Sequence, residues 1–264
     1  MSANATSVSR VSSLAHAAHV VWYRAVAELR AEATRTYAGY LWWILQPLLM
    51  FLVYYVAFNY VLKGRREGFA VFLFSGIVLW QWFSVTVLRC SGSLIASRAL
   101  MQQVSLHKSV FPLSIMVVNS VKFLVTLMIL FVVLAIAGHR PGVTWLVIPV
   151  LLLIELLVIA GFGCFAAMLS PFIPDFKHIL ATILHLAFFV SGILYDLSIL
   201  PEHYQRVLRF NPMAVIIEQS RAVFMHNAMP DFSKLLIPIL IGSVMLAVSL
   251  LLIHRFDKLY PKIG

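Results

Sequence analysis

Two ionisable side chains lie deep inside long apolar runs of the sequence and are the first candidates for chemistry. Lys122 lies about twelve residues from the start of the run 110–137, and Glu155 lies about twelve from the start of the run 143–170. A charge inside a membrane span is costly and usually serves a function or a structural pair. At 1.5 Å per residue, each lies roughly 18 Å from one end of its helix, so antiparallel neighbours would bring them to similar depth. We expect a structural ion pair between Lys122 and Glu155; a charge that faces a pore is the alternative.

Aromatic side chains are concentrated in the two runs 38–62 and 69–90. Trp and Tyr form belts at membrane interfaces, but several of these rings lie deeper than a belt requires. Four of them recur at i, i+3, i+4 and i+7, which is one face of a helix. Flat aromatic rings can stack on the C–H faces of sugars, while the hydroxyl groups of the sugars form hydrogen bonds with the hydroxyl groups of Tyr. We therefore expect a sugar path, with packing against a neighbouring span as the alternative, lined by Tyr40, Phe51, Tyr54, Tyr55, Phe58 and Trp80.

Catalytic and metal-binding motifs are missing from the sequence. It contains no GxxxxGK[ST] phosphate loop, no HExxH and no GxSxG. The ten carboxylates are scattered, the nine histidines show no ligand spacing, and the two cysteines do not form a CxxC pair. We therefore predict no catalytic residue, no metal site and no cofactor bound to this chain. We also predict that the chain is not an enzyme.

The composition indicates lipid as the solvent. Hydrophobic residues make up 62% of the chain and charged residues only 11%, too few for the polar surface of a soluble protein. The 20 Lys and Arg exceed the 10 Asp and Glu. Basic residues gather at helix ends that face anionic lipid, and no basic stripe with interleaved aromatics lies on a polar segment. We expect contact with membrane lipid and no nucleic-acid binding.

Six runs reach the roughly 20 apolar residues that a spanning helix needs. They predict an all-α integral membrane protein with a single transmembrane domain over residues 1–264. An even number of spans places both termini on one side, and a slight excess of Lys and Arg there favours the cytoplasm. The predicted spans are 38–62, 69–90, 110–137, 143–170, 178–197 and 232–254.

Two further segments precede or interrupt these spans. Residues 13–33 carry apolar side chains at helical spacing and predict an amphipathic interfacial helix, with a soluble tail as the alternative. Residues 91–108 contain Ser93, which can N-cap a short helix across the membrane face. A plain linker is the alternative for this second segment.

The segment 198–231 is too long for a turn and too polar for a span. Asn211 followed by Pro212 is typical of an N-cap and a first helical residue. Glu218 and Arg221 lie three residues apart on the helix that would follow. We expect two short helices that dip into the outer leaflet, and an exposed loop is the alternative.

Several stretches resemble one family along nearly the whole chain, from about Trp22 to Arg255. RTYAGYLWWILQP at 35–47 resembles the segment that opens the first span in permeases of type-2 ABC exporters for O-antigen, capsule and teichoic acid. KSVFPL at 108–113 resembles their entry to the third span. The chain also resembles their fifth span and periplasmic gate, at FVSGILY (189–195), Pro201, Asn211-Pro212 and Arg221. The O-antigen channel subunits are the nearest in pattern.

The resemblance implies a homodimer with a channel at its two-fold interface. Two copies of a separate ABC ATPase subunit would bind ATP and Mg, and the substrate would be a glycan on a polyprenyl diphosphate lipid. The protein would be a multi-pass protein of the bacterial inner membrane with both termini cytoplasmic. The implied sites are a coupling helix within 91–108 (Leu94, Ile95, Arg98, Met101), a cytoplasmic gate that meets the diphosphate (Arg30, Arg35), and a periplasmic gate (Asn211, Pro212, Glu218, Arg221).

Other functions fit parts of the same pattern. A permease of this architecture could export teichoic acid, capsule, a drug or heme instead of O-antigen. A membrane-embedded transferase is a further alternative, although such enzymes normally need a cluster of carboxylates or histidines near one membrane face. Arg30 and Arg35 could equally contact lipid headgroups.

Overall fold

A computed structural model describes residues 19–32, 34, 39–58, 68–103, 107–256 and 260 of the chain. This part of the chain is helical and contains no strand. A helix over residues 19–32, here called the N-terminal helix, comes first. The elements that follow are α2 (Leu41–Val56), α3 (Phe69–Ser91), α4 (Ser93–Ala96), α5 (Arg98–Gln103), α6 (Val110–Ile136), η2 (Val143–Val147), α7 (Ile148–Leu169), α8 (Phe176–Val190), η3 (Leu197–Ile199), α9 (Glu202–Leu208), α10 (Pro212–His226) and α11 (Phe232–Arg255).

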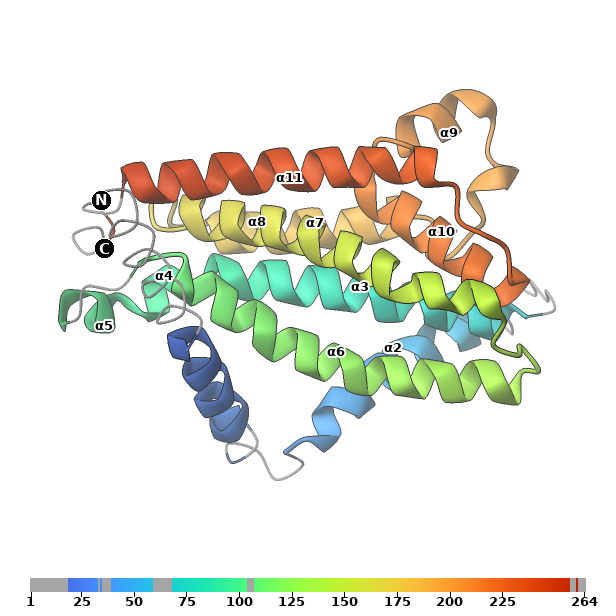
Figure 1. Cartoon of the computed structure of the whole chain (residues 1–264), viewed down its shortest axis with the longest axis horizontal. Helices are drawn as coiled ribbons and strands as arrows, with labels where there is room; N and C mark the ends of the chain where they lie inside the picture. Colours follow the sequence, from blue (N-terminus) through green and yellow to red (C-terminus); the bar gives the residue numbers. More distant parts are fainter. Residues whose placement is uncertain are drawn as a thin grey trace, which may run out of the picture.

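The long helices run side by side, and the short ones gather at the two ends of the bundle (Figure 1). The N-terminal helix, α4 and α5 lie at one end, which we call the α4/α5 end, and α9 and α10 lie at the other, the α9/α10 end. α7 packs against both α3 and α11, and α3 also packs against α6. α3 is the most buried of the long helices, so it forms the centre of the core.

Four described helices are long and apolar enough to cross a membrane: Phe69–Ser91, Val110–Ile136, Val143–Leu169 and Phe232–Arg255. They coincide with four of the six predicted spans. The other two predicted spans contain the shorter apolar helices α2, with 16 residues, and α8, with 15. At 1.5 Å per residue these measure about 24 and 22 Å, less than the roughly 30 Å of a hydrocarbon core.

The predicted span 178–197 is too long at its C-terminal side, because α8 ends at Val190. Gly192 follows with a φ of +67°, a left-handed conformation that ends a helix and favours glycine. The turn that results exposes backbone carbonyl groups inside the protein. Arg221 binds two of them, as described below, because a buried carbonyl group needs a donor.

α7 and α11 approach one another closely at a pair of glycines. A Cβ atom on Gly161 would lie 2.6 Å from the carbonyl oxygen of Gly242, so no larger residue fits without moving a helix backbone. Small residues allow this close packing of spanning helices, where lipid supplies no hydrophobic driving force between them.

The prediction that Ser93 N-caps the segment 91–108 is wrong. Ser93 is the first residue of α4, Gly92 holds the cap position, and no side chain caps the helix. The helix also breaks at Ser97, which separates α4 from α5. Residues 104–106 of this segment lie outside the described part of the chain.

Candidate functional site

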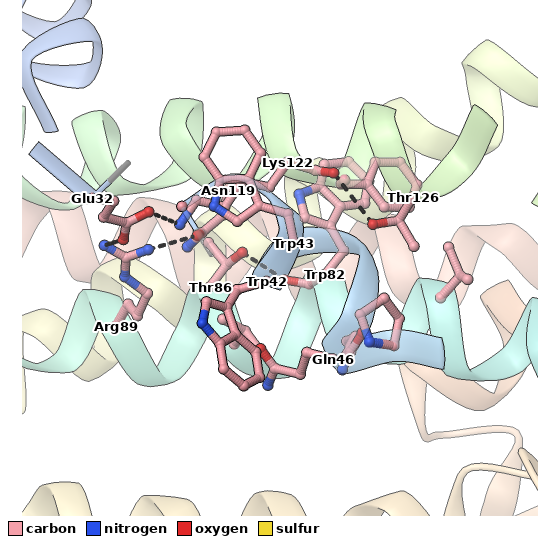
Figure 2. Close-up of a pocket in the computed structure, with 16 residues that line it drawn as sticks. Glu32, Trp42, Trp43, Gln46, Trp82, Thr86, Arg89, Asn119, Lys122 and Thr126 are labelled. Carbon is pink, nitrogen blue, oxygen red and sulfur yellow. Dashed lines mark hydrogen bonds and ion pairs between the residues drawn. The ribbon is translucent and has the colours of Figure 1, made fainter. Parts of the chain in front are cut away.

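A pocket of about 550 Å³ lies between the N-terminal helix, α2, α3 and α6, toward the α4/α5 end (Figure 2). Its walls combine aromatic rings with charged, amide and hydroxyl groups. The polar and aromatic lining residues are Glu32, Trp42, Trp43, Gln46, Gln81, Trp82, Thr86, Arg89, Asn119, Lys122, Phe123 and Thr126. A site with this mixture can bind a ligand that has both polar and apolar parts.

A network of charges crosses one wall of the pocket. The Arg89 guanidinium lies 2.6 Å from a Glu28 carboxylate oxygen and 2.7 Å from one of Glu32. Glu32 also forms an ion pair with the Lys122 amine. Arg89 donates a further hydrogen bond of 3.1 Å to the side-chain oxygen of Asn119, as Figure 2 shows.

Helical spacing explains how five residues from three helices meet. Glu28 and Glu32 are one turn apart on the N-terminal helix and share the face that is turned to the bundle. Asn119 and Lys122 are three residues apart on α6, so they also share a face. Arg89 lies in the last turn of α3, between those two helices. The network therefore fastens the N-terminal helix to α3 and α6.

A second polar contact fastens the same helix to α4. The Arg24 guanidinium donates to the Ser97 hydroxyl at 2.5 Å and lies 4.5 Å from the centroid of the Phe111 ring. Burial lowers the pKa of Arg24 from its usual value, and the nearby Glu28 carboxylate opposes that shift. Trp22 and Tyr23 on the opposite side of the helix are exposed. A helix is therefore present over residues 19–32, its place at a membrane interface stays a prediction, and residues 13–18 and 33 lie outside the described part.

Tryptophans form the aromatic walls. The Lys122 amine lies 5.4 Å from the centroid of Trp43, and Trp82 stacks on Phe123 with ring centroids 4.0 Å apart. The Trp82 indole nitrogen and the Asn119 amide nitrogen are both buried without a hydrogen-bond partner among the described residues. Two donors in this pocket therefore have no acceptor.

The predicted ion pair between Lys122 and Glu155 is wrong. Lys122 pairs with Glu32, whereas Glu155 is fully buried in α7 and neither of its carboxylate oxygens has a partner in the described structure. The depth estimate considered only residues inside the long apolar runs. It therefore overlooked the carboxylates that the N-terminal helix brings to the bundle.

Of the two predicted cytoplasmic gate residues only Arg30 is described, and it does not line the pocket. Arg30 is exposed on the N-terminal helix. Arg35 lies outside the described residues, so its predicted contact with a diphosphate stays a prediction.

The predicted aromatic path divides into two groups. Phe51 and Phe58 pack within the chain, since the Phe51 ring lies 5.3 Å from Phe74 and Phe58 lies 6.1 Å from Phe69. Tyr54 and Trp80 line a second cavity, of about 230 Å³, between α2, α3 and α8. Phe188 of α8 lies 5.1 Å from Tyr54 in the same cavity.

The remaining rings of the set are half-buried or exposed. Tyr55 stacks on Phe51 at 5.4 Å, and Tyr40 is exposed and makes an edge contact of 4.7 Å with Trp43. The packing alternative thus describes Phe51, Tyr55 and Phe58 within one chain. A path for sugars stays a prediction for Tyr54 and Trp80.

The four predicted coupling residues do not share one surface. Leu94 and Met101 are buried in a small core with Phe111, Ala167 and Tyr260, so they cannot form the contact surface for a partner. Ile95 is exposed, and Arg98 is half-buried. This corrects the prediction for Leu94 and Met101, because helical spacing turns them toward the chain's own core.

Asn211 and Pro212 begin α10 as predicted. The Asn211 side chain accepts hydrogen bonds from the backbone N–H groups of Met213 and Ala214, and its amide nitrogen donates to the Ser191 hydroxyl at 3.0 Å. Glu218 forms an ion pair of 2.8 Å with Lys234 at the start of α11. These contacts connect α10 to the end of α8 and to α11.

Arg221 is buried at the α9/α10 end. Its guanidinium donates to the carbonyl oxygens of Gly192 at 2.6 Å, and of Phe72 and Ile193 at 2.9 Å. It also lies 3.4 Å from the centroid of the Phe72 ring. Arg221 therefore joins α10 to α3 and to the turn after α8, and its expected role in a gate is untested by these contacts.

Sequence reasoning missed Arg89, Asn119 and Trp82 as members of a site. Arg89 is a single basic residue near the end of an apolar run, where basic residues are common, and single Asn and Trp residues carry no pattern. The available signal was the i, i+4 spacing of Glu28 and Glu32 on an amphipathic helix, since two carboxylates on its bundle-facing side require cations nearby.

Comparison of the sequence with known proteins identifies the family of the chain. The model of the ABC-2 type transporter family matches residues 21–225. The O-antigen export system permease protein RfbA of Myxococcus xanthus is 30% identical over 223 residues, which are 83% of this chain and 85% of that protein. RfbA of Klebsiella pneumoniae is 27% identical over 237 residues, 89% of this chain and 91% of that protein. The polysialic acid transport protein KpsM of Escherichia coli is 24% identical over 205 residues, 75% of this chain and 78% of that protein. Since the family match extends from the N-terminal helix into α10, the chain belongs to the ABC-2 type transporter family.

Proposed function

We propose that this chain is the channel-forming permease subunit of an ATP-driven exporter that moves lipid-linked, O-antigen-like polysaccharide across the bacterial inner membrane. The observation that carries the proposal is similarity over most of the chain to proteins named for O-antigen export and for polysialic acid transport. Both names refer to long glycans. The chain itself has no phosphate-loop motif, so a separate ATPase subunit would supply ATP and Mg binding.

The proposed assembly contains two copies of this chain and two copies of the ATPase. α2 and α8 would complete six spans, with both termini in the cytoplasm. Their short lengths fit a position at an interface between copies, where the second chain replaces lipid. The cavity of Tyr54 and Trp80 between α2, α3 and α8 is then the candidate for the glycan path.

The α4/α5 end would face the ATPase. Ile95 and Leu100 are exposed there, beside the buried Leu94 and Met101. Exposed apolar side chains on two short helices can pack into a groove of a partner protein. The buried neighbours would transmit movement of α4 and α5 to α6 and α7.

Removal of the gene from its host tests the proposal. We expect loss of the surface polysaccharide and accumulation of the lipid-linked polymer inside the cell, with recovery on re-expression of the wild-type chain. Normal surface polysaccharide in the deletion strain contradicts the proposed substrate.

The coupling surface is tested in the same strain. We expect Ile95→Ala to reduce export at a normal membrane level, whereas Ile136→Ala, an equally conservative change at an exposed residue at the far end of α6, leaves export unchanged. Equal export in the two variants contradicts a coupling role for Ile95.

A further inference from the structure

The pocket between the N-terminal helix, α2, α3 and α6 contains polar groups that the proposed glycan path does not use. Asn119 is 5% exposed and Trp82 is 7% exposed, and both line the pocket. Neither the Asn119 amide nitrogen nor the Trp82 indole nitrogen has an acceptor among the described residues. A buried donor without an acceptor costs free energy, so a ligand with acceptor oxygens would be bound favourably.

The neighbouring cations supply more donors. A guanidinium has five N–H groups and an ammonium has three. Arg89 uses its two terminal nitrogens for Glu28, Glu32 and Asn119, and Lys122 uses its amine for Glu32. Several N–H groups of these two cations therefore stay available to oxygen atoms of a ligand.

The network brings charges of both signs together. Arg89 and Lys122 are paired with Glu28 and Glu32, and of the two carboxylates Glu32 lines the pocket. Both signs of charge therefore meet at the pocket, and a purely anionic ligand is attracted by the cations but repelled by Glu32. A zwitterionic ligand gains from both signs.

The position of the pocket indicates where the ligand comes from. Trp42 and Trp43 lie in the first turn of α2 and Arg89 lies in the last turn of α3, so part of the pocket lies near helix ends. Trp and Arg at helix ends are typical of the level of lipid headgroups. Trp42 is 47% exposed, which leaves this side of the pocket open to lipid.

We propose that this pocket binds the zwitterionic headgroup of a glycerophospholipid. The phosphate oxygens accept hydrogen bonds from Asn119, Trp82 and the cations, while the ammonium group lies near Glu32 and the face of Trp42. The lipid fills the space between the N-terminal helix and the bundle. This binding is independent of which polymer is exported.

Native mass spectrometry of the purified full-length chain tests the proposal. Delipidated protein is incubated with phosphatidylethanolamine, with phosphatidylglycerol of matched acyl chains, or with a polyprenyl diphosphate. We expect one phosphatidylethanolamine per chain to be retained, with an affinity about fivefold or more above that for phosphatidylglycerol. Trp82→Phe, which keeps the stacked ring but removes the N–H group, and Asn119→Leu should each lower retention about three- to tenfold, the worth of one hydrogen bond.

Ser120→Ala is the matched control. Ser120 follows Asn119 on α6, its hydroxyl donates to the Met116 carbonyl of its own helix, and it does not line the pocket. This variant should retain lipid as the wild type does. The proposal is overturned if phosphatidylglycerol or the polyprenyl diphosphate binds as tightly as phosphatidylethanolamine, if no lipid is retained, or if Trp82→Phe and the control behave alike.

Discussion

At the α4/α5 end of the bundle Arg89 and Lys122 are paired with carboxylates, whereas at the α9/α10 end Arg221 is bound by backbone carbonyl groups. The Arg89 and Lys122 side chains are 28% and 18% exposed, and the residue Arg221 is 7% exposed. The carboxylate partners come from one amphipathic helix, while the carbonyl groups come from α3 and from the turn after α8. Ion pairs between side chains can open without unfolding the bundle. Backbone carbonyl groups are fixed by the fold, so they cannot move away from Arg221 unless the bundle unfolds locally. The comparison indicates a movable contact at one end and a fixed joint at the other.

Loss of the fixed joint should have the largest effect. We expect Arg221→Ala to lower the free energy of unfolding on the order of 3–5 kcal/mol, because the buried carbonyl groups of Gly192 and Ile193 lose their guanidinium donor and the Phe72 carbonyl group loses one of its donors. Thermal unfolding of the purified chain and its level in the membrane measure this effect. Arg209→Ala, at an exposed residue beyond α9, is the control and should change stability by no more than about 0.5 kcal/mol. A similar loss in the two variants contradicts the joint.

Crowding of the same guanidinium should have a smaller effect. A Cβ atom on Gly76 would lie 2.5 Å from an Arg221 nitrogen and 3.2 Å from Ile193, so Gly76→Ala must displace the arginine. We expect a loss of about 1–3 kcal/mol, the usual cost of overpacking, measured by the same unfolding assay. At Gly92 the nearest atom is 3.9 Å away, and Gly92→Ala should be close to neutral. Equal stability of the two variants would contradict this prediction, because the Arg221 site would then accommodate the added methyl group.

Loss of one carboxylate in the movable contact should have the smallest effect. Glu32 pairs with both Arg89 and Lys122, whereas Glu28 pairs with Arg89. We expect Glu32→Gln to cost about 1–2 kcal/mol and Glu28→Gln less, since these pairs are partly exposed to solvent. The readout is protease cleavage of the N-terminal helix, which should rise in Glu32→Gln while the rest of the bundle stays protected.

Salt distinguishes the two ends further. Ion pairs near a surface are screened, so 1 M salt should increase cleavage of the N-terminal helix in the wild type. The Arg221 joint should be insensitive to salt, because neutral carbonyl groups are its partners. Cleavage that does not respond to salt contradicts a contact held by charge.

The sequence predicted helices well where apolar length and helix breakers decide the outcome. Four spans and the N-cap of α10 at Asn211 and Pro212 were identified, since each follows from local pattern. The end of α8 was missed by several residues, because Ser191 to Leu194 stay buried although the turn at Gly192 is not helical. Hydropathy measures burial and cannot distinguish a helix from a buried turn.

The pocket was much harder to predict than the spans. Depth along a helix drew attention to Lys122, but depth gives no partner, and Glu32 reaches it from another element. The aromatic stripe was correctly placed on one helix face. The monomer packs Phe51 and Phe58 but leaves Tyr54 and Trp80 at a cavity, a division that depends on the neighbours α3 and α8. Tertiary contacts of this kind have no trace in a single sequence.

Transport in a reconstituted system tests the central claim most directly. The chain and an ABC ATPase from the same host are placed in proteoliposomes that contain a lipid-linked glycan, and the glycan that crosses the membrane is measured with and without ATP. We predict ATP-dependent translocation that requires both subunits and is slowed by Tyr54→Ala at normal protein levels. Absence of translocation with both active subunits present, or translocation that is independent of ATP, would contradict the assignment of this chain as the permease of a polysaccharide exporter.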